Sequence, residues 1–207
     1  MKLFYTCILS LLLCLATYVP GFAQEQTADT VETTTLASPA ASAYHLKAQF
    51  AGGIGFLSAG VGRTFFNEKL ETDLFLGYLP ESIGGDRIVT SAIKVTYRPV
   101  KPIQLKAIDW QPLRIGAQVS YTFGSDYFVK EPGDKYIKGY YGFPTALHGS
   151  ILLGGQIDFT RINKLNKFSA YYEFGSSMEY LISYIQNPKY LSPAKIFKLA
   201  LGVRMRL

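Results

Sequence analysis

His148 and Ser150 are the one pair of side chains in this sequence with the types and spacing of a base beside a nucleophile. Residues two positions apart on a β-strand share a face, so an imidazole there can reach the hydroxyl. Glu179 lies in the next segment that has strand periodicity. A turn centred near residues 163–164 would place Glu179 opposite His148 and Ser177 opposite Ser150. A Ser-His-Glu group able to carry out nucleophilic catalysis would then form.

The elements that must position these residues alternate apolar and polar side chains, and segment 195–207 does so most clearly. Because successive side chains of a strand point to opposite faces, this segment has one apolar face and one polar, cationic face. The apolar set is Phe197, Leu199, Leu201, Val203, Met205 and Leu207, and the other set is Lys198, Ala200, Gly202, Arg204 and Arg206. Strands of this kind, about ten residues long, are typical of barrels that cross a hydrocarbon layer.

The same period of two recurs further up the chain, in segments 70–78, 89–98, 113–123, 147–159 and 168–180. Residues 45–66 are rich in glycine and admit two interpretations: two strands that turn at Gly52-Gly53, or one long strand with a bulge. We favour two strands because a two-glycine turn is a hairpin signal. The sequence therefore predicts an all-β fold, a transmembrane antiparallel up-and-down β-barrel of about eight strands over residues 44–207.

The region before the barrel divides into two predicted parts. Residues 1–23 have the form of a secretory signal peptide, with Lys2 near the start, an apolar run from Leu3 to Val19, and cleavage expected after Ala23. The alternative, a transmembrane anchor, needs a longer run. Residues 24–43 are rich in Thr, Ala, Ser and Glu, which predicts a disordered periplasmic leader. Both cysteines lie in the signal, so the barrel would have no thiol for a disulfide, a metal or a nucleophile.

Composition and motif spacing exclude several other classes of function. The formal net charge is +6, but the basic residues are scattered and form no block of the kind that binds nucleic acid. Asp126, Glu131 and Asp134 lack the spacing of a calcium loop, and no helix is expected after Gly52-Gly53-Ile54-Gly55 to make it a phosphate loop. We therefore expect no nucleic-acid partner, no metal site and no cofactor.

The connections between the predicted strands differ in length. If the barrel begins on the periplasmic side, the outer loops fall at residues 52–53, 80–87, 124–145 and 182–194, and the inner turns at 67–69, 99–111 and 160–167. Long outer loops and short inner turns are expected in such barrels. The exception is the stretch from Pro99 to Pro112, which is long for an inner turn. The loop 124–145 is rich in aromatic residues, so it either grips a partner or a sugar or packs over the barrel mouth.

The predicted lumen contains charges of both signs. An eight-stranded barrel has an interior just wide enough for its own side chains, and an unpaired charge there is costly. The inward set is Lys47, Lys94, Arg98, Arg114, Lys198, Arg204 and Arg206 against Glu71, Asp73, Asp158, Glu173 and Glu179. We expect these groups to form an ion-paired plug, which argues against a wide diffusion pore.

The His-x-Ser spacing on one barrel strand, with Glu on the next, resembles the lipid A 3-O-deacylase family. These proteins are small eight-stranded outer-membrane barrels that hydrolyse an acyl ester of lipid A. The resemblance covers His148, Ser150 and Glu179 together with the barrel architecture, and it implies that Ser150 is the nucleophile, His148 the base and Glu179 the acid that orients it. The alternative is that all three are ordinary polar residues of the lumen, because the alternation places them there.

As a whole, the predicted domain resembles the small outer-membrane β-barrel proteins of Gram-negative bacteria. The resemblance implies residence in the cell outer membrane, contact with outer-membrane lipid including lipopolysaccharide, and recognition of the C-terminal strand by the barrel assembly machinery. Three functions stay open: a structural or surface-interaction barrel with a plugged lumen, which we favour, a lipid A esterase, and a narrow channel or transporter. Whether the chain is an enzyme at all, and its oligomeric state, are open at this point.

Overall fold

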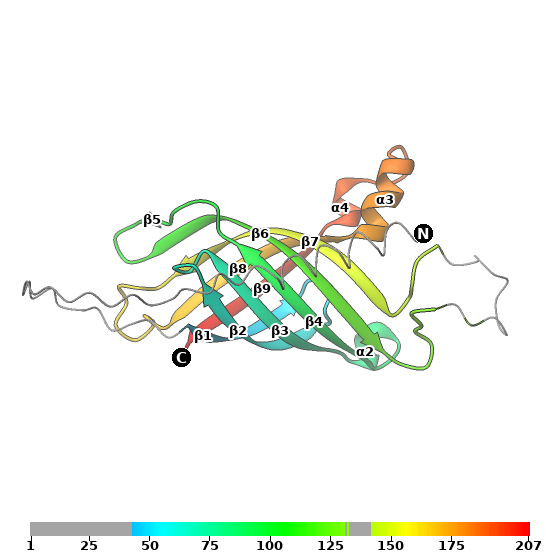
Figure 1. Ribbon diagram of the computed structural model, residues 1–207, viewed down its shortest axis with the longest axis horizontal. Helices are drawn as coiled ribbons and strands as arrows, with labels where there is room; N and C mark the ends of the chain where they lie inside the picture. Colours follow the sequence, from blue (N-terminus) through cyan, green and yellow to red (C-terminus); the bar gives the residue numbers. More distant parts are fainter. Residues whose placement is uncertain (1–42, 131, 133–141) are drawn as a thin grey trace, which may run out of the picture. The chain divides into compact units, whose positions relative to one another are not determined.

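A computed structural model describes residues 43–130, 132 and 142–207 of the chain (Figure 1). Eight strands form a closed barrel in which each strand pairs antiparallel with its neighbours along the chain, and β1 pairs with β9 to complete the ring. The strands are β1 (Tyr44–Ala51), β2 (Leu57–Phe65), β3 (Leu70–Leu79), β4 (Ile88–Tyr97), β6 (Asp109–Phe123), β7 (Leu147–Asp158), β8 (Phe168–Ser177) and β9 (Lys198–Arg206). The predicted all-β up-and-down barrel is thus confirmed. The predicted signal, residues 1–23, and the predicted leader, residues 24–43 apart from Ala43, lie outside the described residues.

The two ends of the barrel differ in what they carry. The backbone N–H of Leu207 donates to the carbonyl of Tyr44 at 3.2 Å, so the first and last strands meet at one end, here called the terminal end. The opposite end, the loop end, carries the helices α2 (Glu81–Gly84), α3 (Met178–Gln186) and α4 (Pro193–Ile196). The two longest connections, 124–146 and 178–197, are at the loop end as predicted. The terminal-end connection 98–108 is nevertheless longer than the loop-end connections 52–56 and 80–87.

The glycine-rich start of the barrel forms two strands, as favoured, but the connection between them spans residues 52–56 and not Gly52-Gly53 alone. Gly52 and Gly53 have φ of 85° and 84°, a left-handed conformation that suits glycine. A Cβ on Gly52 would also lie 2.5 Å from the Cβ of Ala200, so a larger residue would displace β9. The turn is closed by the N–H of Ala51, which donates to the carbonyl of Phe56 at 3.0 Å.

Side chains alternate between the lumen and the outer wall as predicted. On β9, Leu201 is 51% exposed and Arg204 is 1% exposed. The buried side chains of the barrel are mostly polar or charged, while the outward ones are mostly apolar and exposed. Among the outward residues are Leu46, Leu57, Val61, Leu74, Leu76, Ile93, Ile115, Val119, Ile151, Leu153, Phe174, Leu199 and Val203. This distribution is the reverse of that in a water-soluble domain.

Two inward aromatic rings fill space that glycines leave free. A Cβ on Gly60 would lie 2.7 Å from the ring of Phe75, and a Cβ on Gly202 would lie 2.2 Å from the ring of Tyr171. Both rings are buried, at 0% and 3% exposure. The narrow lumen is therefore packed with side chains, as expected for eight strands.

The segment 168–180 was predicted as one strand, and this prediction is wrong at its end. β8 stops at Ser177, and residues from Met178 onward form α3 within what was expected to be strand and loop. The reason is visible in the sequence, because the apolar residues Met178, Leu181, Ile182 and Ile185 follow helical spacing instead of alternation. Glu179 therefore lies in the first turn of a helix, not on a strand.

The stretch predicted as a long inner turn, 99–111, is partly strand. A short strand β5 (Ile103–Gln104) pairs with the beginning of β6, with Ile103 opposite Trp110, so the hairpin extends beyond the barrel wall. Pro112 cannot donate to the ladder, and the register between β6 and β7 shifts between Gln111 and Arg114.

Candidate functional site

A single carboxylate, Glu71, is the centre of the charges in the lumen. Its Oε2 accepts hydrogen bonds from Lys47 Nζ at 2.9 Å and from Arg114 Nη2 at 2.7 Å. Its Oε1 is bound by Arg98 and lies 3.5 Å from Arg204 Nη1. The Glu71 side chain is fully buried, and four cations converge on it: Lys47, Arg114 and Arg204 from three other strands, and Arg98 from directly after β4. Charge-assisted bonds of this kind offset the cost of burying the carboxylate.

Asp73 forms a second centre beside Glu71, on the same face of β3. Lys47 Nζ donates to Asp73 Oδ2 at 2.6 Å, and His45 Nε2 lies 2.6 Å from Asp73 Oδ1. His45, Glu71 and Asp73 lie close enough together to suggest a metal site. However, the ammonium group of Lys47 already binds both carboxylates, so a divalent cation would be repelled there. The geometry fits an ion pair better than a metal centre.

Glu173 on β8 forms the third centre. Lys94 Nζ donates to Glu173 Oε2 at 2.6 Å and to Gln49 Oε1 at 2.8 Å, while Arg114 Nη1 lies 3.4 Å from Glu173 Oε1. The Tyr171 hydroxyl donates to the same Gln49 oxygen at 3.2 Å. Through Arg114 the centre at Glu173 is joined to the one at Glu71. We call these linked groups the lumen network: His45, Lys47, Gln49, Glu71, Asp73, Lys94, Arg98, Arg114, Tyr171, Glu173 and Arg204.

The predicted inward charges are mostly paired within this network, but four are not. Asp158 accepts hydrogen bonds from Gln156 at 2.7 Å and from Ser169, not from a cation. Arg206 donates to the carbonyl of Asn166 at 2.7 Å, and Lys198 lies over the ring of Tyr180. Glu179 bonds to His148 at the loop end. His45 and Gln49 belong to the network although the sequence analysis did not select them; their parity with Lys47 would have identified them.

A second polar region lies at the loop end of the lumen. It is a cavity of about 250 Å³ that we call the vestibule. Its lining is rich in hydroxyl groups and glycine backbone: Gly52, Gly53, Ser120, Thr122, His148, Ser150, Gly175, Ser177, Tyr180 and Lys198. The vestibule therefore contains two of the three residues singled out from their spacing.

The structure brings the predicted trio together. Ser150 is opposite Ser177 in the register between β7 and β8, as predicted. His148 Nδ1 lies 3.2 Å from Glu179 Oε1, so these two residues are neighbours as predicted, although α3 supplies Glu179. Both side chains are partly exposed, at 36% for His148 and 21% for Glu179.

The hydrogen bonds of His148 determine what chemistry the trio can do. Its Nε2 donates to the carbonyl oxygen of Thr145 at 3.0 Å, while Nδ1 faces Glu179. Both partners accept hydrogen bonds, so in this arrangement neither imidazole nitrogen offers a free lone pair to Ser150. For His148 to act as a base on Ser150, the imidazole would first have to leave Thr145.

The loop that borders the vestibule is described only in part. At its base, the N–H of Phe128 donates to the Thr145 hydroxyl at 3.0 Å, and the N–H of Thr145 donates back to the Phe128 carbonyl at 3.0 Å. The prediction of partner or sugar binding is based on the aromatic residues of this loop, and three of them, Tyr136, Tyr140 and Tyr141, lie outside the described residues.

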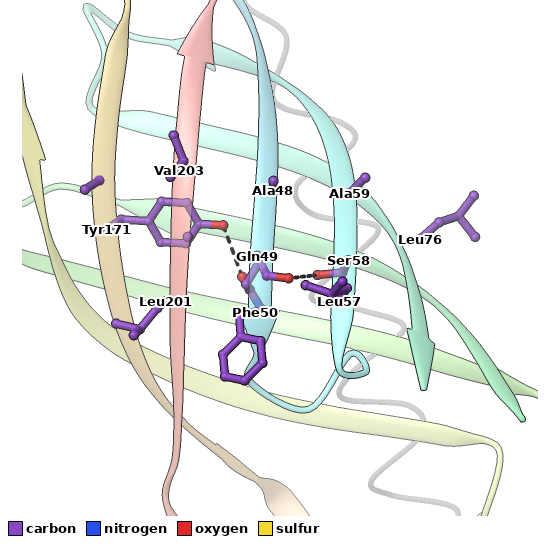
Figure 2. A pocket seen from close by; sticks show the side chains of 12 residues that line it. Ala48, Gln49, Phe50, Leu57, Ser58, Ala59, Leu76, Tyr171, Leu201 and Val203 are labelled. Carbon is purple, nitrogen blue, oxygen red and sulfur yellow. Dashed lines mark hydrogen bonds between the residues drawn. The ribbon is translucent and has the colours of Figure 1, made fainter. Parts of the chain in front are cut away.

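The outer wall has a shallow apolar groove of about 780 Å³ over β1, β2, β8 and β9, with Leu76 of β3 at its edge. Figure 2 shows its lining, in which the larger side chains of Phe50, Leu57 and Leu201 lie below the short side chains of Ala48 and Ala59 in this view. Its polar members, Gln49, Ser58 and Tyr171, are at most 7% exposed, and Figure 2 shows the bond from Tyr171 to Gln49. The groove therefore presents hydrocarbon and suits an apolar environment.

No model of a known protein family matches this chain, and no curated protein matches it. Within residues 43–130, 132 and 142–207, no helix has the length and apolar character needed to cross a membrane.

Proposed function

We propose that this chain is an outer-membrane β-barrel whose lumen is closed by the lumen network and whose role is structural or in surface interaction. The observation that carries the proposal is the reversed distribution of side chains. Glu71, Arg114 and Arg204 are at most 1% exposed inside the barrel, while Leu201 and Leu76 are 51% and 61% exposed outside it. In water this wall would be a large exposed apolar patch, whereas in a bilayer it is solvated by lipid.

The aromatic residues of the wall support the same proposal. Tyr44, Tyr97 and Trp110 are partly exposed near the terminal end, and Tyr78 and Tyr121 are partly exposed near the loop end. Aliphatic side chains dominate between these two levels. Rings at both boundaries of an apolar band are typical of membrane barrels, because their polar atoms reach the headgroups. The last strand, β9, would be the segment that the barrel assembly machinery recognises.

Insertion into lipid is tested by refolding the purified chain into detergent micelles or lipid vesicles. A closed barrel resists detergent until it is heated, so unheated and heated samples should migrate differently on a gel. The circular dichroism spectrum should be predominantly that of β-structure. A protein that folds and stays soluble without detergent or lipid would contradict the proposal.

Closure of the lumen is tested by planar bilayer recording of the purified protein. The network links β1, β3, β4, β6, β8 and β9 across the lumen, so we expect no stable conductance steps. Stable large steps would instead favour the third function, a narrow channel or transporter.

The hydrogen bond between His148 and Glu179 supports a second candidate, hydrolysis of an acyl ester of lipid A, with Ser150 as nucleophile. The test is the mass spectrum of lipid A from cells that produce the protein, the Ser150→Ala variant or the Ser177→Ala variant. Loss of one acyl chain with the unaltered protein and the Ser177→Ala control, but not with Ser150→Ala, would favour the esterase. An unchanged lipid A in all three would leave the structural function.

A further inference from the structure

The helix α3 has an apolar surface without a protein partner. None of its residues is buried, and Ile185 is 77% exposed. Its one charged residue, Glu179, is bound to His148 and so does not contribute to the free surface. The contacts of α3 with β7, β8 and α4 leave all of its apolar side chains at least partly exposed, which is unfavourable in water.

The position of α3 shows what can cover it. Figure 1 shows α3 and α4 to one side of the barrel, beside the loop end of β7, and α3 packs against β7, β8 and α4. α3 follows directly from β8, and α4 leads into β9 through Phe197, which is 40% exposed. Ile196 of α4 is 1% exposed, and α4 packs against α3. Along the chain, exposed apolar residues therefore run from Phe197 after α4 into Leu199 and Leu201 of the outer wall.

The charge of the connecting segment points to the chemistry of the partner. Residues 187–198 contain Lys189, Lys195 and Lys198 and no acidic residue. Lys189 and Lys195 are exposed, and Tyr190 between them is 85% exposed. Exposed apolar and aromatic side chains next to lysines are typical of segments that lie at an anionic lipid surface.

We propose that residues 178–197, the α3–α4 segment, lie in the membrane interface and bind anionic lipid. Ile185 and Tyr190 enter the boundary between headgroups and acyl chains, and Lys189 and Lys195 contact lipid phosphates. The hydrogen bond from His148 to Glu179 holds the first turn of α3 against the barrel while this happens. The proposal rests on the proposed function, because the segment can reach lipid only if the adjoining wall does.

The immersion of the segment is tested with nitroxide labels on single cysteines in a chain in which Cys7 and Cys14 are serine. Ile185→Cys reports on α3, Leu201→Cys on the outer wall, and Arg87→Cys on exposed loop-end surface. The protein is refolded into phosphatidylcholine vesicles containing phosphatidylglycerol. We expect oxygen to relax the labels at 185 and 201 more than a water-soluble nickel complex does, and the reverse at 87.

The outcomes separate this inference from the proposed function. Water-like relaxation at both 185 and 201 would contradict membrane insertion itself. Lipid-like relaxation at 201 with water-like relaxation at 185 would overturn only the inference about the α3–α4 segment, and would leave a protein partner as its occupant.

The preference for anionic lipid is tested with the same label at 185. Replacing both Lys189 and Lys195 with glutamine should reduce the oxygen effect on vesicles that contain phosphatidylglycerol. The matched control is Lys101→Gln, an exposed lysine near the terminal end, which should leave the signal unchanged. Equal signals on phosphatidylcholine alone and on the mixed vesicles would overturn the anionic part of the proposal.

Discussion

The lumen network and the vestibule are both polar, but they differ in how completely their charges are paired. In the network, each of the carboxylates of Glu71, Asp73 and Glu173 bonds with at least two groups, and their side chains are at most 4% exposed. Beside the vestibule, the carboxylate of Glu179 has one partner, His148, and its Oε2 is buried without a hydrogen bond. In the network, the atoms left without a hydrogen bond include the Nε atoms of Arg98, Arg114 and Arg204, while every carboxylate is paired. The comparison suggests that the middle of the barrel holds the structure together, while the loop end keeps room for a ligand or a rearrangement.

The largest expected effect is that of Glu71→Gln. This change leaves Lys47, Arg98, Arg114 and Arg204 around a neutral side chain, and breaking a buried pair in this way costs about 3–5 kcal/mol. The cost is measured as the difference in the free energy of unfolding in urea between the variant and the unaltered protein, both in lipid vesicles. The control is Glu81→Gln, which removes only an exposed contact with Arg87. Equal stability of the two variants would show that the network does not hold the barrel together.

The next largest effect concerns packing, which we compare between the lumen network and the neighbourhood of the vestibule. In Gly202→Ala the new Cβ would lie 2.2 Å from the ring of Tyr171, so we expect destabilisation by about 1–3 kcal/mol. In Gly149→Ala, between His148 and Ser150, the new Cβ would lie 3.5 Å from Met178, an ordinary contact. The same unfolding measurement compares them. Equal stability of the two variants would mean that the lumen can accommodate a methyl group beside the ring of Tyr171.

The smallest effect is expected for His148→Ala. Its bond to Glu179 is partly exposed to solvent, so its loss should cost no more than about 1 kcal/mol in the free energy of unfolding. A loss as large as that of Glu71→Gln would contradict the distinction between network and vestibule, and would make the loop end part of the structural core.

Much of the fold follows from the alternation of side chains, and the exceptions have identifiable causes. The inward positions of Glu71, Lys94 and Arg114 were predictable because a barrel strand has only two faces. The helix that begins at Met178 was missed because the apolar pattern of β8 was extended past the point where its period changes. The hydrogen bond from His148 to Thr145 could not be predicted, since it depends on the path of the loop that precedes β7.

The central claim, that the outer wall faces lipid, is tested most directly by a pair of matched arginine substitutions. Leu201 and Leu207 are the same residue type on the same face and are 51% and 52% exposed, but Leu201 is near the middle of β9 and Leu207 follows its end. The free energy of folding into lipid vesicles is measured for each variant. We predict a cost of about 2–4 kcal/mol for Leu201→Arg and about 0–1 kcal/mol for Leu207→Arg, because the cost falls from the middle of the bilayer to its surface. Equal costs at the two positions would contradict the account.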